Sequence, residues 1–561
     1  MPEPAFNTTG SLLLLPVSQS LGFPLDQVNF VTCQLFALTA AFWFRLYLSP
    51  SRASPRVRHA VATTIGSAFL IFCFGWYSAH ILVLVTVCYL IMVFADIDNV
   101  HKYSLVTAMG YLTACQACRA YIFNYAVPST DFSGVPEAAA SGRTTAKVEA
   151  EPVSSRPDLF LVLVFLKRRC RNLQPITSVN GNKDGLIVNT PLMIVTQKIT
   201  TLAFQLHDGM CKKPDQLTPE QKLLAINARP SPLQYLSYNL NFLSVLVGPC
   251  SNYRDYLDFI EGGHISRRLR RLSGACNGHN GHITAPDPSP LGAVCRKLLV
   301  CSGCMLFFLV VTRSLPIRLN VEPDFVSQNS FLVRLTYAFF SVQAARPKFY
   351  FAWTLADAVN NAAGYGFSGM DGNGKASWDL IGNLNILGIE TATSFKTFID
   401  NWNIQTAVWL KTVCYDRAPR HRLALTFILS ALWHGVFPGY YFTFITAIPI
   451  TIAARAIRKS VRHHFLSSRG LKLGYDVLTW AATQLTICYT VMPFLLLSVE
   501  PTFIYYRSMY FHVHVISILA AVALQPKHKS RETRTSSSSS LSSVSPVQCQ
   551  PDLSNNNGKI D

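Results

Sequence analysis

Long apolar runs separated by short basic loops follow one another along most of this chain. We expect membrane-spanning segments near residues 28–48, 61–76, 79–95, 104–126, 191–205, 235–249, 292–312, 331–356, 423–454, 475–498 and 503–524. A helix needs about 20 residues to cross the hydrocarbon core. Since several runs are short or interrupted, we predict an all-α polytopic membrane protein with about ten to eleven transmembrane helices, some of them tilted or re-entrant.

The polar stretches between and beyond these runs divide the chain. We expect a polar leader over residues 1–27, a membrane domain over 28–524, and a disordered Ser-rich tail over 525–561. Residues 135–190 resemble an inserted loop, because their first half is rich in Ala, Ser, Glu and Pro. Their apolar run Leu159–Leu166 is too short to cross a bilayer as a helix.

Composition and charge support the membrane class and limit the partners. Hydrophobic residues make up 50% of the chain and charged residues only 14%, whereas soluble domains carry about 25% charge. The net charge of +19 would suggest nucleic acid in a soluble protein, but here the basic residues lie in loops between apolar runs. Such loops are typically held on the cytosolic side. We therefore expect membrane lipids or a phosphorylated cosubstrate as partners, and no nucleic acid.

One histidine, His434, lies inside a long uncharged run. Leu423–Ala454 contains no Lys, Arg, Asp or Glu, and an imidazole in lipid is costly unless it has a partner or a function. Pro438 and Gly439 follow His434 closely and should break the helix, which would open room for a ligand. A purely structural histidine is the alternative. We favour a general base, since burial keeps an imidazole neutral.

The candidate partner of His434 is Asn403, 31 positions earlier. The midpoint falls between Ala418 and Pro419, in the charged stretch DRAPRHR. If two helices fold back at this break, both residues lie roughly 23 Å from the turn. The amide of Asn403 can stabilise an oxyanion or hold a substrate carbonyl. A simple interhelical hydrogen bond is the alternative, and Asn401 is the competing residue, although it could be a helix cap.

A third polar set interrupts the aromatic-rich segment Phe349–Gly369. Trp353, Asp357 and Asn360 recur at i, i+4 and i+7 and therefore share one helix face. Such a face could form the wall of a polar tunnel for a head group or hydroxyl. It could equally be a helix end with local caps, and the sequence leaves both interpretations open.

Other patterns point away from metal and cofactor chemistry. His282 and Asp287 match the HxxxxD spacing of one acyltransferase class, but the prolines around them prevent a helix from orienting the pair. The two CxxC pairs lie in apolar runs without nearby ligands, so we expect no metal site and no bound cofactor. A transporter or lipid scramblase, with polar groups lining a path through the membrane, is the alternative from another class.

The segments around these polar residues resemble a known family. WNIQT (Trp402–Thr406) and SALWHGVFPGYY (Ser430–Tyr441) are similar to the membrane-bound O-acyltransferase (MBOAT) family, whose Asn/His signature matches Asn403 and His434. Three further segments resemble the lysophospholipid acyltransferase branch of this family, in particular members that act on lysophosphatidylethanolamine and lysophosphatidylserine. These segments are FCFGWYS, MIVTQKITTLAFQLHDG and KFYFAWTLADAVNNAAG. The resemblance covers residues 24–524 and is interrupted at 135–189.

This resemblance implies a fold, a reaction and a location. We expect the MBOAT fold around a buried catalytic chamber in a multi-pass protein of the endoplasmic reticulum membrane. Acyl-CoA, with oleoyl-CoA as the favoured donor, would be the cosubstrate, and the lysophospholipid would enter from the bilayer. The resemblance implies that Asn403 and His434 are the catalytic residues. We expect substrate-binding residues along the tunnel at Trp353, Asp357, Asn360, Gln405, Thr406, Trp433 and Tyr440.

Another acceptor within the same family is the nearer alternative. The branch that acts on sterols and diacylglycerol is expected to carry an FYxDWWN-like stretch, whereas this chain reads FIDNWN at Phe398–Asn403. That difference argues against these acceptors. Head-group choice, acyl preference and oligomeric state are left open by the sequence.

Overall fold

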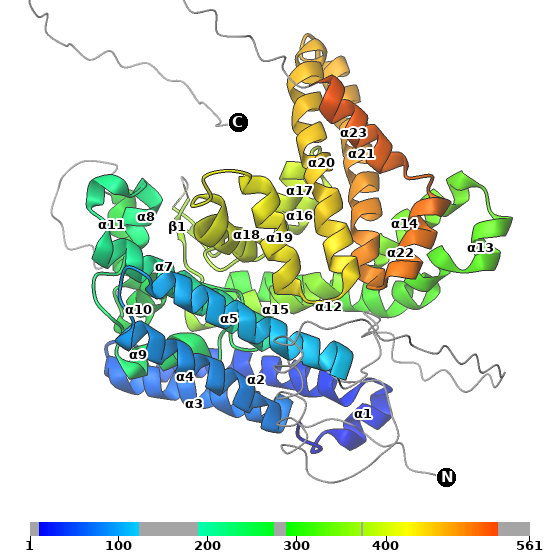
Figure 1. Ribbon diagram of the computed structural model, residues 1–561. Helices are drawn as coiled ribbons and strands as arrows, with labels where there is room; N and C mark the ends of the chain where they lie inside the picture. Colours follow the sequence, from blue (N-terminus) through cyan, green and yellow to red (C-terminus); the bar gives the residue numbers. More distant parts are fainter. Residues whose placement is uncertain (1–9, 123–188, 274–287, 372–373, 525–561) are drawn as a thin grey trace, which may run out of the picture. The chain divides into compact units, whose positions relative to one another are not determined.

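Helices make up most of the part of the chain that the structure describes (Figure 1). The computed structural model describes residues 10–122, 189–273, 288–371 and 374–524. These residues belong to one compact unit that ends at Leu524. Most of the expected insert at 135–190 and the whole expected tail at 525–561 lie outside the described residues, as do His282 and Asp287.

The N-terminal half is built from helices that pack on one another at the apolar runs. Its helices are α1 (Leu15–Leu21), α2 (Leu25–Tyr47), α3 (Pro55–Phe74), α4 (Ser78–Phe94), α5 (Val100–Ala117), α7 (Asn189–Cys211), α8 (Pro219–Leu224), α9 (Pro232–Leu240), α10 (Tyr253–Glu261) and α11 (His264–Ser273). Residues 1–27, expected as a polar leader, therefore include helix α1 and the start of α2.

The C-terminal half carries the candidate chemistry. Its helices are α12 (Leu291–Val311), α13 (Pro323–Gln328), α14 (Phe331–Ala345), α15 (Pro347–Ala363), α16 (Ile386–Glu390), α17 (Phe395–Asn401), α18 (Ile404–Leu410), α19 (Arg422–His434), α20 (Pro438–Val461), α21 (Arg469–Leu496), α22 (Val499–Ser508) and α23 (His512–Ala523). A small antiparallel pair, β1 (Gly369–Met370) and β2 (Ala376–Ser377), aligns Gly369 with Ser377 and Met370 with Ala376.

Four helical stretches are long and apolar enough to cross a membrane: Leu25–Tyr47, Pro55–Phe94, Leu291–Val311 and Pro438–Phe465. Shorter apolar helices occur at Arg422–His434 and His512–Ala523. These counts refer only to the described ranges. The expectation of ten to eleven transmembrane helices is therefore not confirmed. A mostly helical chain with several helices apolar enough to cross a membrane is confirmed.

Several expected spans are interrupted, and the interruptions have local causes. Pro347 and Pro438 occupy the first turns of α15 and α20, where proline is tolerated because the first helical N–H groups have no partner within the helix. The run at 235–249 forms only the nine-residue helix α9 and a buried irregular segment. Asn241 stabilises this change of direction by donating to the Ser237 and Tyr238 carbonyls.

The apolar interior consists of two clusters of buried side chains. The first gathers residues of α2 to α7, α9 and α10 together with Val294 of α12, Val359 and Ala362 of α15, and Trp409, Val413 and Trp433. The second gathers residues of α14 to α17 and α20 to α23, and Trp402 and Phe494 pack against it. The segment from Trp402 to Trp433 thus contacts both clusters. It lies at the boundary between them, which is where the candidate site is found.

Candidate active site

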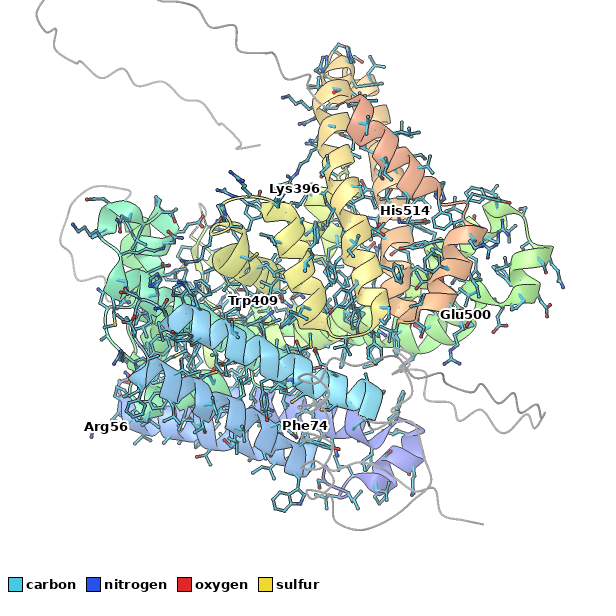
Figure 2. The ribbon with its side chains drawn as sticks, in the orientation of Figure 1. Arg56, Phe74, Lys396, Trp409, Glu500 and His514 are labelled. Carbon is cyan, nitrogen blue, oxygen red and sulfur yellow. The ribbon has the colours of Figure 1, made fainter. Side chains whose placement is uncertain are left out.

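Asn403 and His434 lie at the two ends of a helical hairpin. Asn403 directly precedes α18, which continues as a π-helical turn over Lys411–Tyr415, and His434 is the last residue of α19. The arms contact each other through the Trp409 and Trp433 rings, whose centroids are 5.8 Å apart. Trp409 is labelled in Figure 2 and is only 1% exposed. The side chains of Asn403 and His434 make no hydrogen bond with each other.

The turn of this hairpin is fixed to α7 by a charged pair. Arg417 donates to both oxygens of Asp208, at 2.9 and 2.5 Å, and also to the Thr412 carbonyl. The side chains of Arg417 and Asp208 are only 15% and 3% exposed. Burial alone would raise the pKa of the Asp208 carboxyl, but the hydrogen bonds and charges of Arg417 and Lys212 outweigh it and hold this pKa below its usual value. The pair therefore stays ionised.

Removing this anchor should cost measurable stability. We expect Arg417→Ala to lower the free energy of unfolding by about 3 kcal/mol, because it leaves the buried Asp208 carboxylate with a single cationic partner. The matched control is Lys411→Ala on the same hairpin, since its pair with Glu220 is 48% and 73% exposed and should be worth less than about 1 kcal/mol. Unfolding of the detergent-purified variants measures both; equal losses would contradict the assignment of an anchor.

His434 is surrounded by aromatic rings. Ring centroids of Trp433, Phe494, Phe444 and Tyr440 lie 4.7, 4.9, 5.3 and 5.7 Å from the imidazole. The side chain is nevertheless half-buried rather than fully enclosed. Neither ring nitrogen hydrogen-bonds to any residue within the described ranges. An imidazole with open nitrogens in an apolar setting is available as a proton acceptor.

Two glycines shape this aromatic environment. Gly435 has φ 146°, where a side chain would strain the backbone, and an added Cβ would lie 3.1 Å from the Tyr440 ring, which would have to shift slightly. Gly439 lets α20 approach α21, because an added Cβ would clash with the Pro493 carbonyl oxygen at 2.1 Å. The close packing at Gly439 brings Phe494, the residue after Pro493, against His434.

The backbone at His434 is held from two other helices. Gln116 of α5 donates through Nε2 to the Trp433 carbonyl at 3.2 Å and to the His434 carbonyl at 3.5 Å. The indole N–H of Trp433 donates to the Met193 carbonyl of α7 at 3.1 Å. Trp433, predicted to bind substrate, therefore has its polar group committed to the protein. Gln116 was not predicted, because nothing in the local pattern of α5 distinguishes it.

Asn403 follows a tryptophan that is fixed by an aromatic cluster. Trp402 lies 5.5 Å from Trp353, 5.8 Å from Phe349 and 6.1 Å from Phe398, measured between ring centroids. The predicted tunnel residue Trp353 is thus brought next to the residue that precedes Asn403.

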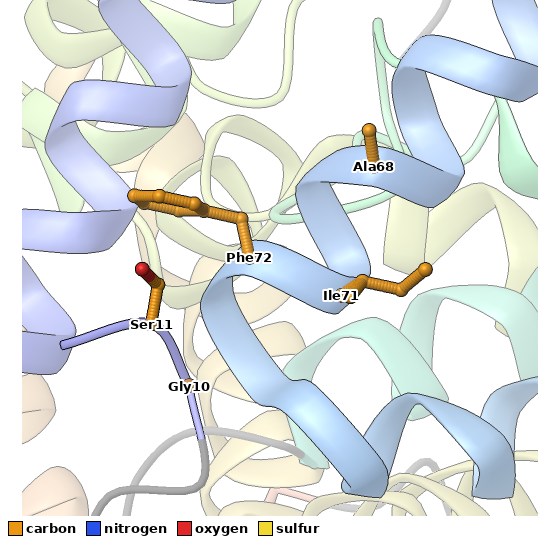
Figure 3. A pocket seen from close by; sticks show the side chains of 5 residues that line it. All are labelled: Gly10, Ser11, Ala68, Ile71 and Phe72. Atoms are coloured by element: carbon orange, nitrogen blue, oxygen red, sulfur yellow. The ribbon is translucent and has the colours of Figure 1, made fainter. Parts of the chain in front are cut away.

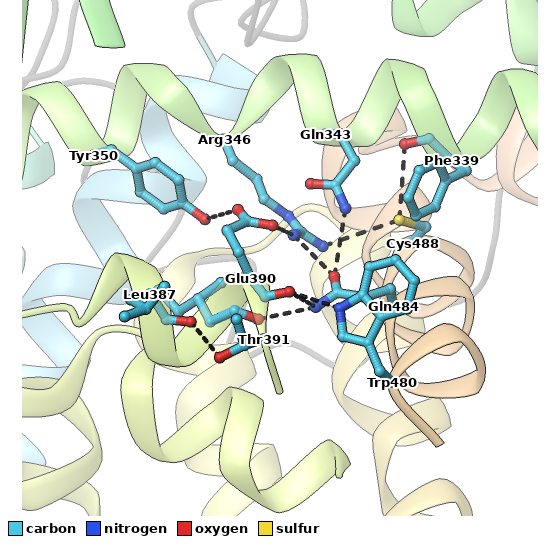
Figure 4. A network of polar contacts seen from close by, with 11 residues as sticks. Phe339, Gln343, Arg346, Tyr350, Leu387, Glu390, Thr391, Trp480, Gln484 and Cys488 are labelled. Atoms are coloured by element: carbon cyan, nitrogen blue, oxygen red, sulfur yellow. Dashed lines mark hydrogen bonds and ion pairs between the residues drawn. The ribbon is translucent and has the colours of Figure 1, made fainter. Parts of the chain in front are cut away.

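A polar network supports this aromatic cluster (Figure 4). Arg346 donates to Glu390 at 3.2 Å and to Gln484 at 3.1 Å. Tyr350 donates to Glu390 at 2.5 Å. The guanidinium also lies over the Phe398 ring, 5.0 Å from its centroid. The largely buried Arg346 guanidinium is therefore neutralised next to the rings that pack on Trp402.

The remaining predicted tunnel residues are engaged in hydrogen bonds. Asp357 pairs with Lys297 of α12 at 2.6 Å, and Asn360 donates to the Leu243 carbonyl at 3.1 Å. Gln405 donates to the Gly382 carbonyl at 3.2 Å, while the Thr406 hydroxyl accepts from Gln197 at 2.9 Å. Of these bonds, that of Gln405 reaches the loop at residues 380–385, while the others join α15 to α12 and to Leu243, and α18 to α7.

Two other features do not form part of this constellation. Figure 3 shows an open pocket lined by Gly10, Ser11, Ala68, Ile71 and Phe72, which contains no titratable group. His514, labelled in Figure 2, lies within hydrogen-bonding distance of Tyr489 (2.8 Å) and Thr446 (3.0 Å). Its ring nitrogens are thus occupied by structural bonds, unlike those of His434.

The chain is similar to known proteins over most of its length. The sequence profile of MBOAT, the membrane-bound O-acyltransferase family, matches residues 177–495. The chain is 52% identical to human "Membrane-bound glycerophospholipid O-acyltransferase 1" over 95% of its length and 96% of the relative's. It is 46% identical to the chicken "Membrane-bound glycerophospholipid O-acyltransferase 2", covering 97% of this chain and 92% of that protein.

A more distant relative extends the same picture. "Lysophospholipid acyltransferase 6" of Drosophila melanogaster is 34% identical over 94% of this chain and 64% of its own length. The matched family segment includes both ends of the α18–α19 hairpin. The chain therefore belongs to the membrane-bound O-acyltransferase family.

Proposed function

We propose that this protein transfers a fatty acyl group from acyl-CoA to the free hydroxyl of a lysophospholipid. Lysophosphatidylethanolamine and lysophosphatidylserine are the proposed acceptors, oleoyl-CoA is the proposed donor, and no further cofactor takes part. The near full-length similarity to glycerophospholipid O-acyltransferases supports this class of substrate. The observation that carries the proposal is the His434 imidazole, with open nitrogens at the end of α19, on the same hairpin as Asn403.

The reaction follows from these two groups. His434 takes the proton of the lysolipid hydroxyl as its oxygen attacks the thioester carbonyl carbon. The negative charge that develops on the carbonyl oxygen is stabilised by the Asn403 amide. When the C–S bond breaks, the thiolate leaves and takes the proton from the imidazolium. The products are a diacyl phospholipid and free CoA, and His434 returns to its neutral form.

The apolar surroundings serve this chemistry. Water in the chamber would hydrolyse the thioester, and the aromatic rings around His434 would exclude it. The thioester is already activated, so the site needs only to bring hydroxyl and carbonyl together and to move one proton. We propose that the two substrates reach the site between α15, α18 and α20, past Trp353 and Tyr440.

The decisive assay is release of free thiol from oleoyl-CoA by the detergent-purified protein. We expect release only when lysophospholipid is added, with one diacyl phospholipid formed for each thiol. A panel of lysolipids with different head groups then ranks the acceptors. A transporter or scramblase would release no thiol with any of them, and that result would overturn the proposal.

We also propose a multi-pass protein of the endoplasmic reticulum membrane with about ten to eleven crossings, in which the shorter helices also lie within the membrane as tilted or re-entrant segments. Glycosylation-site scanning of the loops in microsomes counts the crossings. Staining of the tagged protein together with a marker of the endoplasmic reticulum tests the location.

A further inference from the structure

The loop between β2 and α16 lies along the residues that carry Asn403. The Asn385 N–H donates to the Asn401 carbonyl at 3.0 Å, and the Ile404 N–H donates to the Asn383 carbonyl at 2.8 Å. The Gln405 side chain adds its bond to the Gly382 carbonyl. The two segments are thus joined on both sides of Asn403, and a shift of the loop would shift that residue with it.

Within this loop, the Asn383 side chain lies between Gln405 and Asn403. It is only 5% exposed. Its Oδ1 accepts from the Gln405 backbone N–H at 3.1 Å, and its Nδ2 donates to Asn403 Oδ1 at 3.1 Å. Asn383 was not among the predicted site residues, because it lies outside the helices and its sequence spacing relates it to neither Asn403 nor His434.

These bonds determine which way both carboxamides face. A backbone N–H can only donate, so the Asn383 atom that faces Gln405 must be its oxygen. The Asn383 amino group must then point to Asn403, and the Asn403 atom that meets it must be its oxygen. By elimination, Asn403 presents its own amino group on its remaining side. That group donates to no other residue within the described ranges.

The Asn403 backbone explains why its side chain is free for this role. The residue has φ 49° and ψ 51° and makes no capping bond to α18. Asparagine tolerates this left-handed conformation better than most residues. The side chain therefore neither caps its helix nor turns back on its own backbone, and Asn383 is left as its fixed contact.

We propose that Asn383 is a positioning residue that makes Asn403 a hydrogen-bond donor to the substrate. In this arrangement the Gln405 N–H fixes the orientation of the Asn383 amide, and Asn383 in turn fixes the orientation of the Asn403 amide. The Asn403 amino group then faces the thioester oxygen as it becomes negative. Asn403 then stabilises the oxyanion and does not accept from the lysolipid hydroxyl. The inference rests on the proposed acyl transfer, and it adds the orientation of the amide and the residue that fixes it.

Asn383→Leu tests the inference, because leucine has a similar volume and lacks both hydrogen-bonding groups. We expect kcat to fall roughly 10- to 100-fold, since a small misplacement of a catalytic group costs that much. KM for both substrates should stay within about twofold, because Asn383 acts on the transition state through Asn403. The matched control is Asn385→Ala, which removes the cap on Gly388 N–H in the same loop. This control should lose stability and keep its kcat.

A double-mutant cycle separates positioning from a general structural effect. In the Asn403→Ala background, Asn383→Leu should change kcat by less than about threefold, because the group that it orients is already absent. A full 10- to 100-fold loss in that background, or wild-type kcat in Asn383→Leu alone, would overturn the inference.

The same cycle distinguishes this inference from the proposed function. If Asn403→Ala loses activity and Asn383→Leu does not, only the positioning role is refuted. If Asn403→Ala itself turns over like the wild type, the catalytic role of Asn403 is refuted and the positioning role with it. Thermal unfolding of each purified variant shows that the comparison is made between folded proteins.

Discussion

His434→Ala should lose nearly all acyl transfer while the protein still folds and inserts into the membrane. In the proposed reaction the imidazole accepts the proton of the attacking hydroxyl, and a general base typically contributes about 10²–10⁴-fold to the rate, or roughly 3–5 kcal/mol of barrier. The packing around it comes from four aromatic rings that remain in the variant. Thiol release with oleoyl-CoA and lysolipid measures the loss.

Two further variants make this result specific to the base. His434→Gln keeps a polar side chain of similar length but cannot accept and release the proton, so we expect it to be as inactive as the alanine variant. His514→Gln replaces a histidine whose nitrogens contact Tyr489 and Thr446 and should keep its turnover, at some cost in stability. Turnover near wild type in His434→Gln would refute the role of His434 as base.

Asn403→Ala is expected to show the second largest effect. One donor to an oxyanion is worth about 2.7–4 kcal/mol, which corresponds to a loss of roughly 10²–10³-fold in kcat. The loss should appear in kcat with little change in KM, because the charge on the carbonyl oxygen develops only in the transition state.

Asn401 provides the matched control, since it was the competing candidate in the same sequence segment. Its side-chain amide donates to the Thr397 carbonyl at 2.7 Å, within its own helix α17. Asn401→Ala should therefore keep its kcat. If Asn401→Ala loses more activity than Asn403→Ala, the assignment of the oxyanion donor must move to Asn401.

The hairpin was predictable from the sequence because its signals are local. DRAPRHR interrupts the apolar pattern with charge and proline, and the structure turns there between the π-helical turn and α19. Pro438 likewise begins α20 four residues after α19 ends at His434. Proline restricts the backbone wherever it occurs, so these two breaks needed no knowledge of the tertiary structure.

The number of membrane crossings could not be predicted from local sequence signals alone. Hydropathy alone cannot distinguish a spanning helix from an apolar segment buried in protein. The run at 235–249 was expected to span, yet half of it is irregular and buried. Lys198 of α7, which is fully buried, donates to the Tyr238 carbonyl near the end of α9 and to the Ser244 hydroxyl in the irregular segment. Such a distant partner is what makes irregular backbone tolerable inside the protein.

The orientation of the Asn403 amide could not be predicted from the sequence either. The hydrogen bond between Asn383 and Asn403 joins residues 20 positions apart, and one of them belongs to a loop without periodicity. Gln116 lies more than 300 positions from the His434 carbonyl that it binds. Sequence patterns find groups that carry chemistry, because their types are unusual in an apolar run. They do not find the ordinary amides that hold those groups in place.

The α18–α19 hairpin also separates the residues proposed to carry out the reaction from the helices proposed to contact the lipid. Both reactive groups come from one continuous stretch of 32 residues, anchored at its turn by Arg417. The aromatic rings packed beside His434 and Trp402 come from α15, α20 and α21, which lie elsewhere in the chain. If the proposed reaction holds, changes in those three helices would alter which membrane lipid is accepted while the reacting residues of the hairpin stay the same.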